Sequence, residues 1–137
     1  MNNFPKVPTN WKDLVKLKDF LSDCDISYLR LPDYEKFYAL YRNLVPKDLA
    51  LEIIKGQMNN KVIALVPNNF PYNNVLQYLP KVKHYCLWSL KRKLTENEIK
   101  KHVKKAFPNS EWFYFERKNG YKSVPKIWHS HIFIKNL

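Results

Sequence analysis

The sequence contains very little glycine: only two of its 137 residues are glycine. Loops that wrap phosphate groups need closely spaced glycines, because their backbone approaches the ligand in conformations that other residues avoid. The chain therefore lacks the residues to build the phosphate-binding loop of P-loop NTPases or the dinucleotide fingerprint of Rossmann folds. Both of these classes of nucleotide-binding protein are excluded.

Cysteine is equally scarce, and long apolar runs are missing. Cys24 and Cys86 lie far apart without Cys-x-x-Cys spacing, and each sits in an apolar stretch. We expect both thiols to be reduced and structural. No signal-peptide pattern, lipidation signature or apolar run of membrane-spanning length occurs in the sequence. These features predict a cytoplasmic protein without a membrane partner, in the host cytoplasm if the protein is viral.

Acidic residues are few in the second half of the chain. Residues 81 to 137 hold 14 Lys or Arg against 4 acids, whereas residues 1 to 80 hold 10 against 8, so most of the formal net charge of +12 is C-terminal. A field of one sign attracts polyanions and speeds their encounter. Charge alone leaves two interpretations open, a surface that binds an anionic partner and a lysine-rich solubilising surface.

The apolar periodicity predicts a single α+β domain over residues 1–137. Three N-terminal helices are expected: one begins after Asn10 as N-cap and reaches Leu21, one follows Pro32, and one runs from Pro46 to about Gly56. The predicted strands, loop and turn are Val62–Val66, a loop over Pro67–Pro80, Val82–Leu90, Glu111–Arg117, a turn at Asn119-Gly120, and Trp128–Lys135. The order is helices followed by a β-β-α-β-β unit, which predicts a mostly antiparallel four-stranded sheet.

The second predicted helix carries an aromatic stripe. Its rings recur at helical spacing and belong to Tyr34, Phe37, Tyr38 and Tyr41. We interpret this stripe as core packing.

The helix in the β-β-α-β-β unit begins with a capping box. Thr95 is its N-cap and Glu98 its third residue, while Leu94 and Ile99 are placed to form a hydrophobic staple. Its apolar face is Ile99, Val103, Ala106 and Phe107, and its other face carries Lys100, Lys101, Lys104 and Lys105. These lysines either contact phosphates or form a solvated face.

Three of the four histidines fall on two predicted strands. His129 and His131 alternate, so both project from one face of the sheet, and His84 on a neighbouring strand can join them. Such a group is compatible with a metal site or with acid-base catalysis. No Cys, Asp or Glu stands at a convincing ligand spacing beside them, so we expect no metal and no other cofactor. The alternative for His84 is a hydrogen-bonded structural histidine.

Aromatic residues are abundant on the predicted strands. Three tryptophans lie on three different strands: Trp88, Trp112 and Trp128. Exposed rings flanked by lysines hold single-stranded nucleic acid or modified bases by stacking. Two such rings around a methylated guanine, with an acid such as Glu116 or Glu111 reading its edge, would form a cap-binding pocket. We interpret Trp88 as a core residue because it lies among apolar neighbours.

In the order and spacing of these residues, the sequence resembles the domain-of-unknown-function family that includes the fungal N-acetylglucosamine-induced protein and has members in large DNA viruses. The matching positions are Arg30, Pro32, Pro67, Asn69, Pro71, Tyr72, His84, Trp88, Trp112, Phe113, Ser123, Pro125, His129 and His131. The chain departs from the pattern at Phe115-Glu116 and at Lys126. The resemblance implies a fold more than an activity, and it suggests a viral role.

Together these observations predict an RNA- or nucleotide-binding module, in its sharpest form one that recognises a 5′ mRNA cap or RNA end. The predicted ligand-binding residues are Asn69, Tyr72, His84, Trp112, Tyr114, Glu116, Trp128, His129 and His131. The predicted phosphate-binding residues are Lys91, Arg92, Lys104, Arg117 and Lys122. Two alternatives remain open. One is a small histidine-dependent enzyme acting on a phosphorylated or nucleotide-sugar substrate with His129 and His131 as its acid-base pair. The other is a host-interaction or scaffold protein whose basic face is incidental.

Overall fold

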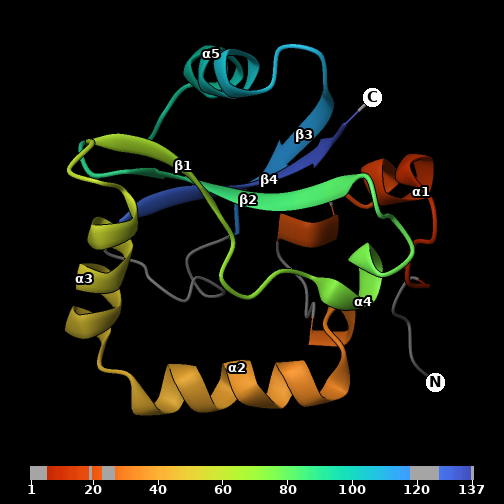
Figure 1. Ribbon diagram of the computed structural model, residues 1–137, viewed down its shortest axis with the longest axis horizontal. Coiled ribbons are helices and arrows are strands. Elements are labelled where there is room, and N and C mark those ends of the chain that lie inside the picture. The colour runs from red at the N-terminus through yellow and green to blue at the C-terminus, as the bar shows by residue number, and fades with distance from the viewer. Residues whose placement is uncertain (1–5, 19, 23–26, 118–126, 137) are drawn as a thin grey trace.

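The protein has an α+β architecture in which helices precede a four-stranded antiparallel sheet (Figure 1). The computed structural model describes residues 6–18, 20–22, 27–117 and 127–136. The strands are β1 (Ile63–Pro67), β2 (Val82–Ser89), β3 (Glu111–Phe115) and β4 (Trp128–Lys135). They lie in the order β1-β2-β4-β3, and each neighbouring pair is antiparallel. The fold class expected from the sequence is therefore confirmed.

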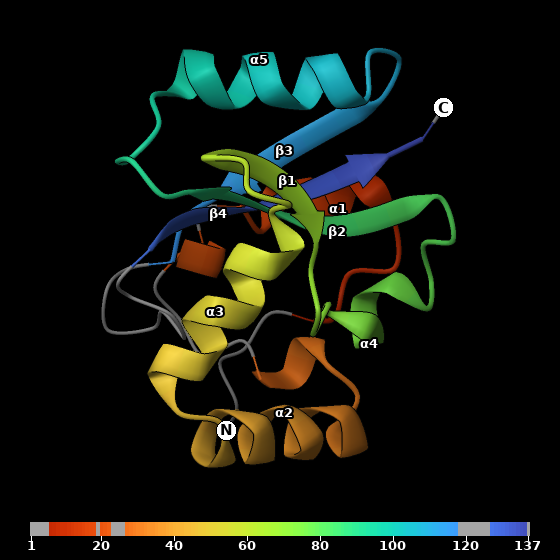
Figure 2. The same ribbon diagram turned by 60° about the vertical axis from the view of Figure 1, so that its left-hand side comes forward.

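Helices cover both faces of this sheet (Figure 2). They are α1 (Trp11–Lys16), α2 (Pro32–Leu44), α3 (Lys47–Gln57), α4 (Asn73–Leu76) and α5 (Glu96–Ala106), with short 3-10 helices at Phe20–Ser22 and Ser27–Leu29. Helix α5 lies over one face, and the N-terminal helices lie on the opposite side, with α2 farthest from the sheet (Figures 1 and 2). Among the described residues, no helix is both long and apolar enough to cross a membrane.

The two faces of the sheet bury different side chains. On the α5 side, Leu87 and Ile132 pack against Ile99 and Val103 of the helix. On the other side, the chain buries two neighbouring apolar groups, one around Tyr72 and Phe133 and one around Trp88. Strand β4 is buried from His129 to Ile134 because both of its faces are covered.

Helix α5 begins as its sequence predicts. The Thr95 hydroxyl accepts a hydrogen bond from the Glu98 backbone N–H, and the Glu98 carboxylate accepts one from the Thr95 backbone N–H, which completes the capping box. Arg92 also donates two hydrogen bonds to this carboxylate, at 2.8 and 3.0 Å. The Arg92 side chain, followed by the Thr95 backbone, lowers the pKa of Glu98 to about 2.

Three local predictions are wrong. The first helix was expected to reach Leu21, but α1 ends at Lys16 and Phe20–Ser22 form a separate 3-10 helix. No residue of α2 is buried, so its aromatic stripe does not pack in the core; instead Tyr34, Phe37, Tyr38 and Tyr41 surround the ring of Phe70. The segment Pro67–Pro80, expected to be a loop, contains the short helix α4. The predicted turn at Asn119-Gly120 lies outside the described residues.

Candidate functional site

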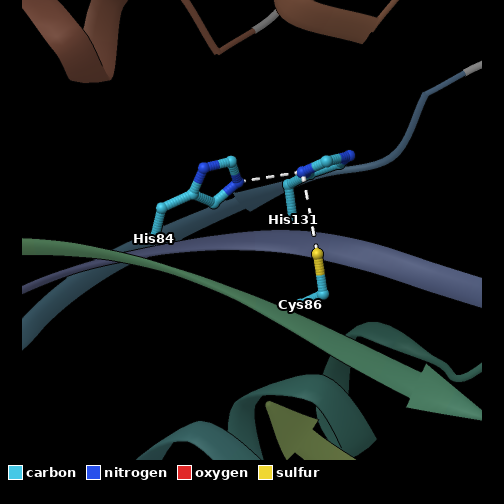
Figure 3. A group of neighbouring side chains, drawn as sticks. All are labelled: His84, Cys86 and His131. Atoms are coloured by element: carbon cyan, nitrogen blue, oxygen red, sulfur yellow. Dashed lines mark hydrogen bonds between the residues drawn. The ribbon is translucent and has the colours of Figure 1, made fainter. Parts of the chain in front are cut away.

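The sheet brings His84, Cys86 and His131 together in a buried group that we call the His-Cys cluster. In the antiparallel pairing of β2 with β4, Cys86 stands opposite His131, and His84 precedes Cys86 by two residues. All three side chains therefore project from the same face. His84 Nε2 lies 2.9 Å from His131 Nδ1, and Cys86 Sγ lies 4.0 Å from the same Nδ1 atom (Figure 3).

Aromatic stacking fixes the two imidazole rings of the cluster. The His84 ring stacks on Phe133 with a centroid distance of 4.4 Å and an interplanar angle of 18°. The His131 ring stacks on Phe115 at 4.8 Å and 5°. Because both phenyl rings belong to neighbouring strands, the sheet itself sets the orientation of the imidazoles.

The segment between β1 and α4 covers the His-Cys cluster with polar groups. The Asn68 side-chain nitrogen lies 3.2 Å from His84 Nε2 and donates a hydrogen bond to Cys86 Sγ at 3.4 Å. The Asn68 side-chain oxygen accepts from the Phe70 backbone N–H at 2.7 Å, which fixes the orientation of the amide. The Tyr72 backbone N–H points to His84 Nδ1 at 3.4 Å.

Arg30 holds this covering segment in place from outside. The arginine is buried, donates from Nε to the Phe70 carbonyl at 2.8 Å, and forms an ion pair with Glu35 at 3.1 Å. Its guanidinium also lies over the rings of Tyr38, at 4.1 Å, and Tyr72, at 5.1 Å. One side chain thus joins α2, the covering segment and the residues around the cluster.

Burial keeps the His-Cys cluster uncharged near neutral pH. Desolvation is the largest cause that lowers the pKa of both His84 and His131 well below the ordinary value, and the charge of Arg30 acts in the same direction. Desolvation raises the pKa of the Cys86 thiol to about 12. Two neutral imidazoles and a neutral thiol are therefore present at pH 7, and both imidazoles can act as proton acceptors or as metal ligands.

The structure separates the predicted ligand-binding residues into two groups on opposite faces of the sheet. One group lies on the side of the N-terminal helices or on the segment that covers it: Asn69, Tyr72, His84, His129 and His131. The other lies on the α5 side: Trp112, Tyr114 and Trp128. A single small ligand cannot contact both groups, so the prediction of one pocket lined by all these residues is wrong.

Individual residues of the first group have internal partners. His129 stacks on the buried ring of Trp88 at 4.2 Å, which confirms the interpretation of Trp88 as a core residue. Tyr72 is fully buried, and burial raises its pKa. Asn69 is exposed and exchanges hydrogen bonds with Gln57. His84 does bridge its strand and the covering segment, as a structural histidine would.

The predicted phosphate-binding residues are also divided. Lys91, Arg92 and Lys104 are exposed in or just before α5, on the same side of the molecule. Arg117 is buried and donates to the Leu21 carbonyl, so it does not belong to that surface. Lys122 lies outside the described residues. Glu116, predicted to read the edge of a base, forms an ion pair with Lys93 at 3.8 Å.

Sequence reasoning missed the role of Cys86 in this arrangement. The expectation that no Cys, Asp or Glu stands beside the histidines is wrong, because the Cys86 thiol is part of the cluster. The signal was present as His84-x-Cys86, two residues that alternate on a predicted strand and so share a face. Asn68 had no comparable signal, because its contact depends on the path of an irregular segment.

The comparisons with known proteins extend the description of the fold. No protein-family model and no curated protein matches the sequence. The crystal structure of HTC1 aligns with 93% of this chain and 85% of that chain, with a TM-score of 0.55 and 17% sequence identity. At this identity the likeness shows a shared fold alone.

Proposed function

We propose that the protein binds RNA or a nucleotide through the exposed side of α5, a surface formed by Lys100, Lys101, Lys104 and Lys105 that we call the α5 surface. The observation that carries the proposal is the position of these four exposed lysines opposite the buried Ile99 and Val103. The helix is anchored by its apolar face, so the ammonium groups form a fixed cationic strip. The lysines of such a strip can contact successive phosphates of a nucleic acid.

Partly exposed aromatic rings lie on the edge strand of the sheet, on the side of the apolar face of α5. Trp112 and Tyr114 project from β3 toward the α5 side, with ring centroids 6.2 Å apart and an interplanar angle of 27°. Strand β3 is an edge strand of the sheet, so part of each ring stays accessible. Lys18 adds a cation 5.4 Å from the centre of the Tyr114 ring. Glu96 and Glu116 also lie near this ring, since their charges, after desolvation, raise the pKa of Tyr114. Accessible aromatic rings are the groups on which single-stranded bases stack.

The arrangement of these rings favours a single strand over a 5′ cap. A cap site needs two rings that face each other across the thickness of a base. Trp112 and Tyr114 are instead neighbours on one face of one strand, so each offers a separate platform. We therefore propose stacking of successive bases, with phosphates on the lysines. A hollow of about 300 Å³ on α5 is lined by Glu98, Lys101, His102 and Lys105, and none of these is a Trp, Tyr or Phe that could sandwich a base.

A charge-matched pair of variants tests the proposal. Changing the four lysines of the α5 surface to Gln should abolish most of the binding of a short fluorescent single-stranded RNA, measured by anisotropy. Changing Lys36, Lys47, Lys55 and Lys61 to Gln removes the same charge from exposed positions on α2, α3 and the turn after α3. This control should bind as the wild type does. Equal loss in both variants would show a general charge effect and would sink the proposal.

The second candidate function is a small histidine-dependent enzyme acting on a phosphorylated or nucleotide-sugar substrate. The observation that favours it is the meeting of His84 and His131 at 2.9 Å, close to the buried Arg30, whose charge acts on both rings. Turnover of such a substrate that is lost in His131→Ala and kept in the α5 variant would support it. Binding of RNA without turnover would favour the first candidate.

We also propose that the chain belongs to the domain-of-unknown-function family that includes the fungal N-acetylglucosamine-induced protein. Its support is that Arg30, Tyr72, His84 and His131, four of the positions that carry the resemblance, converge from distant parts of the chain. The cytoplasm is the compartment that we propose, since Cys86 is a free thiol.

A further inference from the structure

We propose that the His-Cys cluster is a binding site for a zinc-class transition-metal ion, with His84 Nε2, His131 Nδ1 and Cys86 Sγ as ligands. These three atoms lie within 4.8 Å of one another, and all three residues are buried. The cluster lies on the face of the sheet opposite the α5 surface, so the inference does not rest on the proposed RNA binding.

The ligand set and its dimensions suit zinc. Imidazole and thiolate are the usual protein ligands of Zn²⁺, and mixed sets of the two hold the ion in both structural and catalytic sites. In a tetrahedral site, two nitrogens are about 3.4 Å apart and a nitrogen and a sulfur about 3.6 Å apart. The observed distances are 2.9 Å for His84 Nε2 to His131 Nδ1 and 4.0 Å for Cys86 Sγ to His131 Nδ1. These two pairs need to move by about half an ångström each. The third pair, His84 Nε2 and Cys86 Sγ, lies within 4.8 Å and needs to close by up to about 1.2 Å, which is within the reach of side-chain rotation.

The two histidine ligands are also oriented in advance. Stacking on Phe133 and Phe115 holds the imidazoles with their ligand nitrogens toward the same point (Figure 3). A metal ion therefore meets rings whose rotational freedom has already been lost on folding, and this pre-organisation favours binding.

Two N–H groups from the covering segment approach the His84 ring. The Asn68 side-chain nitrogen lies 3.2 Å from Nε2, and the Tyr72 backbone N–H donates to Nδ1 at 3.4 Å. A neutral imidazole carries one ring proton, so the proton between His84 Nε2 and His131 Nδ1 belongs to one of these two rings, and the other ring supplies the unshared electron pair.

Metal binding changes the protons in a defined way. For both nitrogens to coordinate, the ring proton between His84 Nε2 and His131 Nδ1 moves to the far nitrogen of the imidazole that carries it. The Cys86 thiol releases its proton to solvent as the thiolate–metal bond forms. Asn68, already 3.4 Å from Sγ, then donates to the thiolate and stabilises it. The Arg30 charge, which would oppose a cation, is offset by its ion pair with Glu35.

Cobalt substitution tests the site directly. The chain is prepared without a histidine tag, stripped with a chelator and titrated with Co²⁺. We expect about one cobalt per chain, with a thiolate-to-cobalt charge-transfer band and the intense visible bands of tetrahedral Co²⁺. Added Zn²⁺ should remove both bands and raise the melting temperature.

Matched variants show which thiol and which imidazoles bind. Cys86→Ser, which preserves shape, should lose the charge-transfer band, whereas Cys24→Ser should keep it. His131→Ala should weaken cobalt binding at least tenfold, whereas His102→Ala, at a half-exposed position on α5, should not. Should Cys86→Ser or His131→Ala fail to fold, the wild-type spectrum and Cys24→Ser still decide the question. The proposal is overturned if the folded wild type shows no charge-transfer band or if the band persists in Cys86→Ser.

Discussion

Arg30 combines, in one side chain, the contacts that hold the segment over the His-Cys cluster. Its Nε atom donates to the Phe70 carbonyl, one terminal nitrogen pairs with Glu35, and its plane covers Tyr38 and Tyr72. A lysine has one cationic nitrogen and no planar group, so it cannot make these contacts together. Arg42 also lies near Tyr38, at 5.2 Å, but it is exposed.

Arg30→Lys should therefore lower the free energy of unfolding by about 2 to 3 kcal/mol, the sum of a lost buried hydrogen bond and weakened ring contacts. Arg42→Lys should change it by less than about 0.5 kcal/mol, as at most exposed positions. Urea unfolding of the two variants gives both values. Equal effects would mean that Arg30 does not hold the covering segment.

At this same scale, the sequence predicted the alignment of His84, His129 and His131 because alternation on strands fixes the face of each residue. It also predicted that His84 can join the other two, and His84 meets His131, but it did not predict the partners Cys86 and Asn68. The pairing of Cys86 with His131 depends on the register between β2 and β4, and the contact of Asn68 depends on an irregular segment. Neither is encoded in local spacing.

At the scale of elements, α5 was predicted in detail and α2 was not. The capping box and staple of α5 are local signals, formed by residues close together in sequence. The aromatic stripe of α2 correctly indicated a helix, but its partner is Phe70, which lies on an exposed covering segment rather than on the sheet. Periodicity identifies an apolar face without saying what covers it.

Thr95→Ala should lower the free energy of unfolding by about 1 kcal/mol, because the first turn of α5 loses its N-cap acceptor. Asn97→Ala, at an exposed position in the same turn, should change it by a few tenths of a kcal/mol at most. Urea denaturation distinguishes the two. A similar loss in both would indicate that the turn is weakened in general and that the capping box has no special part.

At the scale of the whole molecule, the excess of positive charge in the C-terminal half of the sequence lies partly on one side of the structure. Most of the net charge belongs to the C-terminal half, and four of its lysines form the α5 surface on one side of the sheet. The residues predicted to line one pocket did not gather there, since the sheet separates the rings of Trp112, Tyr114 and Trp128 from the histidines on its other face. The sequence thus predicted which residue types are clustered along the chain. Their placement on one face of the sheet or the other depends on how the strands pair in three dimensions.

The salt dependence of RNA binding tests the central claim most directly. If the four lysines of the α5 surface contact phosphates, the logarithm of the association constant for a short single-stranded RNA should fall with the logarithm of salt concentration with a slope of about −3. The variant with all four changed to Gln should show a slope near zero, and the α2–α3 control should keep the wild-type slope. A wild-type slope near zero, or the same slope in all three proteins, would contradict the account.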